Sequence, residues 1–185
     1  MMRDAGVKSP EENRTDSERL DRLFNSLWSH PCFTIAAVQG VALGGGAGLI
    51  ACSDHVIALD SSRIALSEAK LGILPAVIGP YVYRRVGSAQ FRRLTMLAGR
   101  FDGHEALNIG MVDQVSTSLD ETAEMIEATI ATVMSTGPVA VTEAKSLTQT
   151  LDSWRGTDED LRRWTLDKTS EMRGSPEGQE GLSAF

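Results

Sequence analysis

The sequence predicts an α/β fold in its first part and an all-helical region in its last third. Short, almost wholly apolar segments lie at residues 32–38, 55–59 and 63–66, and a glycine-rich segment separates the first of them from the second. After Thr117 every segment has a helical spacing of apolar residues. We therefore expect an α/β region over residues 1–117 and a helical region over residues 118–185.

The first element is a predicted helix over residues 10–30. Ser9 is placed to cap it, Pro10 takes the first helical position, and Glu11 and Glu12 are acids in the first turn. An apolar stripe at helical spacing follows within this segment. Pro31 is expected to end the helix.

The three apolar segments are predicted strands, the last two joined by a turn at Asp60-Ser61-Ser62. Nearly continuous apolar strands are typical of parallel sheets that are covered on both faces. Two short helices separated by Gly87 are expected next. Residues 102–115 then predict a capped helix, a glycine stop and an edge strand.

The C-terminal region is predicted to contain four helices. The first, over residues 118–135, is amphipathic and is followed by a break at Gly137-Pro138. Further helical patterns cover residues 139–151 and 157–172, and a final helix begins near Ser175.

Composition restricts the class of partner. The chain has 25 acidic and 18 basic residues and a formal net charge of −7, which argues against nucleic acid. No apolar run approaches the roughly 20 residues that span a bilayer, and the N-terminus has no secretory pattern. Cys32 and Cys52 lie in apolar contexts and are expected to be reduced core thiols. We expect a cytoplasmic protein without a membrane or nucleic-acid partner.

Glycines at positions 44, 45, 46 and 48 form the most unusual segment of the sequence. Leu49 stands where a dinucleotide fingerprint requires glycine, and a phosphate loop would need Gly-Lys-Ser/Thr. What remains is a glycine turn that leads into a helix, whose first N–H groups are unpaired. The turn either serves close packing of a helix on a sheet or holds an anion or oxyanion.

Glu68 is the candidate acid or base. It follows an apolar strand and precedes another apolar run, where loss of solvent would raise its pKa into a useful range. The alternative is that Ser67 caps a turn while Glu68 is solvated or pairs with Lys70. Sequence alone leaves both open.

The other polar candidates favour structural roles. The three histidines are scattered, without metal-ligand or triad spacing, and Asp54 is expected to end a helix or cap a loop. Two pairs of arginines fit exposed helix faces or phosphate contacts, and three tryptophans fit helix packing or a subunit interface. These residues are His30, His55, His104, Arg84, Arg85, Arg92, Arg93, Trp28, Trp154 and Trp164.

Residues 35–87, from "IAAVQGVALGGGAGLIACSDH" through "SEAKLGILPAVIGPYVYRRVG", closely resemble the central block of the crotonase (enoyl-CoA hydratase/isomerase) superfamily. The resemblance continues through "AGRFDGHEALNIGMVDQV" and the helical tail. It implies a spiral of ββα turns, followed by C-terminal helices that build homotrimers or hexamers. Against that pattern the spiral is expected to be incomplete at its N-terminal end, and the chain to be truncated at both ends.

The resemblance also implies site residues. The backbone N–H of Gly45 corresponds to a donor that holds the thioester oxygen of an acyl-CoA as an oxyanion, and Glu68 corresponds to a catalytic glutamate. Gly48 stands where hydratases usually carry a second glutamate. Substrate contacts are expected from Leu43, Gly44, Gly45, Gly48 and Pro75. No metal is implied, and no cofactor, because coenzyme A is part of the substrate.

The function implied is that of an acyl-CoA lyase of the enoyl-CoA hydratase type, which adds water across a C2=C3 double bond. Among subgroups, "GGGAGL" with "SEAKLGILPAVIGPYV" is most similar to methylglutaconyl-CoA hydratase. Degradation of fatty acids or branched-chain amino acids is the expected setting. The alternatives are an enoyl-CoA double-bond isomerase and a catalytically incomplete, truncated family member.

Overall fold

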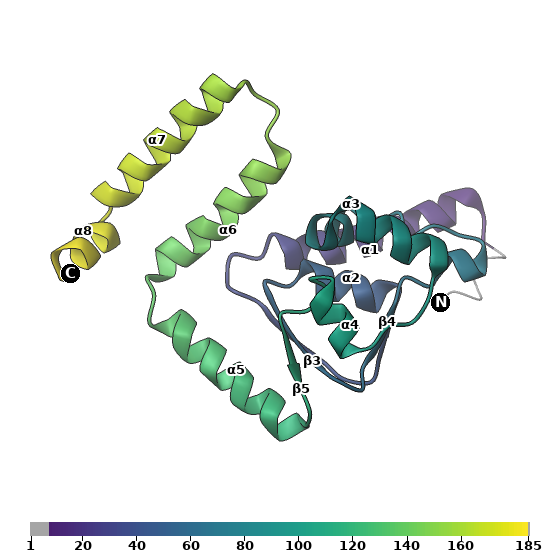
Figure 1. The fold of residues 1–185 in the computed structure, drawn as a ribbon. Helices are drawn as coiled ribbons and strands as arrows, with labels where there is room; N and C mark the ends of the chain where they lie inside the picture. Colours follow the sequence, from purple (N-terminus) through teal and green to yellow (C-terminus); the bar gives the residue numbers. More distant parts are fainter. Residues whose placement is uncertain (1–7, 185) are drawn as a thin grey trace. The chain divides into compact units, whose positions relative to one another are not determined.

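A computed structural model describes residues 8–184 of the chain (Figure 1). It contains two compact units. The first comprises the residues up to His30 and Thr34–Glu127, and the second comprises Pro31–Phe33 and the residues from Ala128 onward. Helix α5 (Leu119–Met134) starts next to the boundary predicted at residue 118, and its first residues belong to the first unit.

Two small parallel sheets form the centre of the first unit. Strands of the larger sheet lie in the order β1-β3-β5, and β2 pairs with β4 in the smaller one. Each pass of the chain thus adds one strand beside the strand of the pass before. The strands are β1 (Ile35–Val38), β2 (Val41–Leu43), β3 (His55–Leu59), β4 (Arg63–Ala65) and β5 (Gln114–Ser116).

Helix α2 (Gly45–Cys52) connects the two sheets, since it runs from the end of β2 to the start of β3 (Figure 1). The predicted strands at 55–59 and 63–66 are confirmed, and the first strand is shorter than predicted. Strand β2 was not predicted, because its three residues lie between glycines and are too few to show a periodicity.

Helix α1 (Pro10–Trp28) begins as predicted. Ser9 Oγ accepts a hydrogen bond from the Glu12 N–H at 3.2 Å, and the Glu12 carboxylate accepts one from the Ser9 N–H at 2.8 Å. This reciprocal pair is a capping box, which satisfies N–H groups that the helix cannot. The buried Phe24 then anchors α1 to the core.

Glycines end or interrupt the later elements of the first unit. Helix α3 (Gly79–Leu97) is broken at Gly87, where φ is 75° and ψ is 167°, so the two predicted short helices are confirmed. Asp102 caps α4 (Gly103–Asn108) by accepting from the Glu105 N–H, and Gly110 turns the chain toward β5. Among the described strands β5 has β3 as its single partner, which confirms the predicted edge strand.

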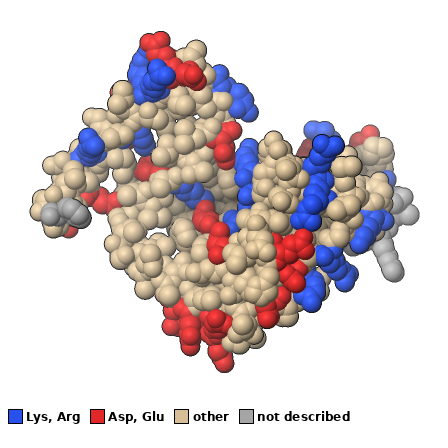
Figure 2. Space-filling view, in the orientation of Figure 1, with Lys and Arg blue, Asp and Glu red and all other residues tan. Residues whose placement is uncertain are grey.

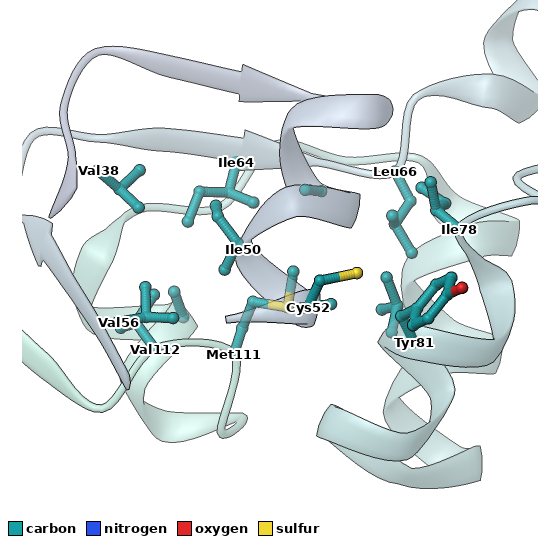
Figure 3. Close-up of a cluster of buried hydrophobic side chains, with 14 of the residues drawn as sticks. Val38, Ile50, Cys52, Val56, Ile64, Leu66, Ile78, Tyr81, Met111 and Val112 are labelled. Carbon is teal, nitrogen blue, oxygen red and sulfur yellow. The ribbon is translucent and has the colours of Figure 1, made fainter. Parts of the chain in front are cut away.

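The hydrophobic core of the first unit lies around α2 and includes residues from both sheets and from α3 (Figure 3). Cys52 is completely buried there, and burial raises the pKa of its thiol to about 12. The prediction that Cys32 is also a core thiol is wrong. Cys32 is exposed because it precedes β1, which begins only at Ile35.

The second unit is helical and contains α6 (Pro138–Ser153), α7 (Asp158–Gly174) and α8 (Pro176–Ala184). The predicted break at Gly137-Pro138 is confirmed. The rings of Trp154 and Trp164 pack with centroids 6.0 Å apart, which supports a packing role for both. No single helix among residues 8–184 is long and apolar enough to cross a membrane, and α5 and α6 meet that test of length and composition only as a bent pair.

Candidate functional site

The glycine turn joins the end of β2 to the start of α2. Gly44 is buried, has a φ of 50° and a ψ of −109°, and donates its N–H to Ala65 O at 3.0 Å. Gly45 is the first residue of α2, a position at which the helix itself provides no acceptor for the backbone N–H. The partial positive charge of the helix end lies at the same place. The turn therefore leaves the Gly45 amide without an acceptor in its own helix.

Glu68 is the first residue of the 3₁₀ helix η2 (Glu68–Leu71) that follows β4. It is only 5% exposed, and within the described part of the chain its Oε2 atom is buried without a hydrogen-bond partner. Glu68 is therefore not solvated in this structure, and Ser67 makes no capping bond through its side chain. Lys70, two residues further along η2, is exposed.

The glycine turn and Glu68 meet at one edge of the smaller sheet. Leu43 and Ala65 are partners in the parallel pair β2–β4, so the residues that follow these two strands leave the sheet side by side. A Cβ atom placed on Gly44 would lie 2.9 Å from Glu68 Oε1. The carboxylate thus lies against the glycine turn, within one residue of the Gly45 amide.

Burial raises the pKa of Glu68 above its usual value, and a hydrogen bond with the residue's own backbone opposes part of this effect. A carboxyl group with a raised pKa holds its proton nearer to neutral pH. Such a group is suited to accept a proton in one step of a reaction and return it in the next.

Gly48 lies about one turn further along α2, and its Cβ position faces the hydrophobic core and not Glu68. A Cβ atom there would lie 3.0 Å from both Ile78 Cβ and Phe24 Cε1. Phe24 also lies 3.7 Å from the corresponding point on Gly45. The place of a side chain at position 48 is filled by these two residues, which sequence analysis had not connected with the site. The expected substrate contact of Gly48 stays a prediction.

Leu43 and Pro75 lie on either side of the Gly44–Glu68 contact in sequence. Leu43 is half-buried at the end of β2, and Pro75 is buried. Pro75 lines a cavity of about 460 Å³, and none of the described residues that line it carries a charge. The lining consists of Leu74, Pro75, Ala76, Gly79, Pro80, Tyr83, Phe91 and Thr95. This cavity is open to solvent, because Leu74 and Tyr83 in its wall are exposed. Another wall residue, Gly79, is the sequence neighbour of Ile78, which packs against the Cβ position of Gly48.

The arginines of α3 do not all lie on an exposed face. Arg85 donates to Ser53 O at 2.9 Å and to Met111 O at 2.8 Å, and it pairs with Asp113 at 2.6 Å. It therefore joins α3 to the end of α2 and to the segment before β5. Other basic side chains in the region of α3 lie on the surface, as Figure 2 shows. The guanidinium of Arg84 lies over the ring of Trp28, 5.7 Å from its centroid.

The remaining polar candidates lie apart from Glu68. Asp54 accepts hydrogen bonds from the N–H and the hydroxyl of Thr34. Asp54 therefore caps the loop that leads into β1, as predicted. His55 Nδ1 lies 3.8 Å from Asp113 Oδ2. Over residues 8–184, no group of three or more His, Cys, Asp or Glu side chains is arranged to hold a metal ion.

The parallel coil of strands, crossed by a helix that begins at a glycine turn beside a buried glutamate, defines a spiral α/β class of protein. The family model for enoyl-CoA hydratase/isomerase matches residues 2–185. The chain belongs to the enoyl-CoA hydratase/isomerase family.

Solved structures agree with this assignment. An enoyl-CoA hydratase from Shewanella pealeana is 38% identical and superposes with a TM-score of 0.91 over 100% of this chain and 68% of its own. AtuE from Pseudomonas aeruginosa is 36% identical, with a TM-score of 0.92 over 100% of this chain and 70% of its own. The expected crotonase-type fold is confirmed.

A relative named for a different activity matches part of the chain. Ethylmalonyl-CoA decarboxylase from Homo sapiens is 37% identical over 99 residues, which are 53% of this chain and 32% of that protein.

Proposed function

We propose that the protein binds an α,β-unsaturated acyl-CoA and adds water across its C2=C3 bond. The observation that carries the proposal is the position of Glu68. Its carboxylate is buried, and the Oε2 atom has no hydrogen-bond partner among the described residues. The same carboxylate lies against the turn that presents the Gly45 amide. A proton acceptor and an oxyanion donor on one small surface are two of the groups that this reaction needs.

In the proposed mechanism the Gly45 N–H donates a hydrogen bond to the thioester oxygen. The oxygen of water forms a bond to C3 while Glu68 accepts one proton of that water. The C2=C3 electron pair moves toward the thioester, and the Gly45 N–H stabilises the negative charge that develops on its oxygen. Glu68 then gives its proton to C2, so that one water is added and the carboxylate is restored.

The acyl group is proposed to be neutral where it meets the cavity beside Pro75. The described lining residues of this open cavity are uncharged, so they offer a carboxylate no cation to pair with. Methylglutaconyl-CoA, the substrate that the sequence resemblance favours, carries a free carboxylate at the far end of its acyl group. Comparing kcat/KM for crotonyl-CoA and methylglutaconyl-CoA tests the point, and a preference for methylglutaconyl-CoA would contradict it.

Replacing Glu68 tests the central role directly. We expect Glu68→Gln to lower kcat for crotonyl-CoA by about 10²–10⁴-fold, because the amide cannot take up the proton of water. The measurement is the loss of the enoyl thioester absorbance, with circular dichroism to show that the fold is kept. Glu124→Gln, at an exposed position on α5, is the matched control. Near-normal turnover of Glu68→Gln would reject the proposal.

Double-bond isomerisation is the second candidate, and the unpartnered Oε2 atom of Glu68 favours it as well. A single carboxylate can carry a proton from C2 to C4 without a water molecule. Incubation with a 3-enoyl-CoA separates the two activities: an isomerase forms the conjugated product, and a pure hydratase does not. A non-catalytic member would show neither activity, and calorimetry with an acyl-CoA would then decide whether the chain binds the thioester.

The expected homotrimer or hexamer and the cytoplasmic location remain predictions. Light scattering of the purified chain measures the first, and localisation of a tagged chain tests the second.

A further inference from the structure

Gly44 is held firmly at the end of β2. Its N–H donates to Ala65 O at 3.0 Å, and its C=O accepts from the Gly48 N–H at 3.0 Å within α2. Its φ of 50° lies in the region that side-chain-bearing residues rarely adopt. Bonds to β4 on one side and to α2 on the other leave this residue little freedom to shift.

The space beside Gly44 is taken by the carboxylate of Glu68. A Cβ atom on Gly44 would lie 2.9 Å from Glu68 Oε1 and 3.6 Å from Glu68 Cδ. The first distance is shorter than ordinary contacts of a Cβ atom. Because the backbone of Gly44 is fixed, the atom that must move after a substitution is the carboxylate.

We propose that Gly44 is a positioning residue, whose missing side chain and fixed backbone set the orientation of the Glu68 carboxylate beside the Gly45 amide. The effect of Gly44 on turnover rests on the proposed function. Its effect on the orientation of the carboxylate does not depend on that function. It gives Gly44 a different role from the substrate contact that the sequence resemblance implies.

The geometric part is tested by a double-mutant cycle in urea unfolding. Gly44→Ala combines two costs, backbone strain at a positive φ and a clash with Glu68. Gly40→Ala is the matched control, because Gly40 has a φ of 71° and nothing within 4 Å of its Cβ position. We expect Gly44→Ala to lower the urea midpoint more than Gly40→Ala does.

Removing the Glu68 side chain should remove the extra cost. The drop in midpoint from Glu68→Ala to the double variant Gly44→Ala/Glu68→Ala should match the drop caused by Gly40→Ala alone. If Gly44→Ala costs no more than Gly40→Ala, or if Glu68→Ala leaves its cost unchanged, the inference is overturned. This result does not depend on whether the protein is a hydratase.

The catalytic part is tested by steady-state kinetics with crotonyl-CoA. A displaced catalytic group lowers turnover by about 10²-fold for a shift of 1 Å, so we expect that loss in kcat for Gly44→Ala, with KM changed little. Gly40→Ala should keep the kcat of the unaltered chain. A loss confined to KM would instead assign Gly44 to substrate binding. Absence of activity in the unaltered chain would reject the proposed function and leave the unfolding cycle as the test of positioning.

Discussion

At the scale of single residues, Glu68 gives the clearest energetic prediction. Burial raises its pKa, so the folded state binds the proton more tightly than the unfolded state does. The free energy of unfolding therefore falls as pH rises from the ordinary glutamate pKa of 4.5 through the raised value of the folded state, and the loss is complete above it.

Glu68→Gln has no such titration. We therefore expect it to be more stable relative to the unaltered chain at pH 8 than at pH 4, as measured by urea unfolding at both values. A difference between the two proteins that does not change with pH would show that the carboxyl is not held in a desolvated site.

The glycines of α2 differ in the space available to them. Gly48→Ala should cost about 1–3 kcal/mol in the free energy of unfolding, because its Cβ would press on Ile78 and Phe24. Gly45→Ala is the control, since its Cβ would lie at an ordinary 3.7 Å from Phe24 Cζ and alanine favours a helix. Equal stability of the two variants would contradict the packing described here.

Sequence alone located Glu68 and the glycine turn but left open what each does. Burial of Glu68 settles one alternative, because a residue 5% exposed is not solvated. Phe24 and Ile78 could not be assigned to the site in advance. Phe24 belongs to a helical stripe that predicts only a buried face, and the contact of both residues with α2 depends on tertiary packing.

At the scale of elements, one helix is capped by a carboxylate that lies far away in the sequence. Glu177 in α8 accepts the N–H groups of Val139 and Ala140 at 3.0 and 2.8 Å, which the first turn of α6 leaves unpaired. Gly137 makes room for it, since a Cβ there would lie 2.7 Å from Glu177 Cδ. No local pattern in the sequence indicates this contact, because its partners are almost forty positions apart.

Glu177→Ala should therefore cost about 1 kcal/mol, the usual value of a cap, and increase hydrogen exchange at Val139 and Ala140. Glu180→Ala, an exposed glutamate on the same helix, is the control. Unchanged exchange at both amides in Glu177→Ala would mean that the cap does not form in solution.

Elements with strong terminal signals were predicted well. The cap at Ser9 and the break at Gly87 could both be predicted, because each depends on residues close together in sequence. Strand β2 was missed because its three residues have no periodicity of their own. It is fixed by pairing with β4, a long-range interaction.

At the scale of the whole molecule, the order of elements was predictable and the pairing of strands was not. Alternating strands and helices indicate a parallel sheet. Composition does not show that successive passes of the chain place their strands side by side in two parallel sheets. That expectation came from the resemblance, and the fold confirms it. The family assignment covers hydratases and isomerases alike, and the position of Glu68 beside the glycine turn is what supports the proposed chemistry.

The most direct test of that chemistry is a crystal structure with a bound 3-hydroxyacyl-CoA, the product of hydration. We expect the thioester oxygen about 2.7–3.1 Å from the Gly45 nitrogen and the 3-hydroxyl about 2.6–3.2 Å from a Glu68 carboxylate oxygen. A thioester bound away from the glycine turn, or a hydroxyl beyond reach of Glu68, would contradict the account.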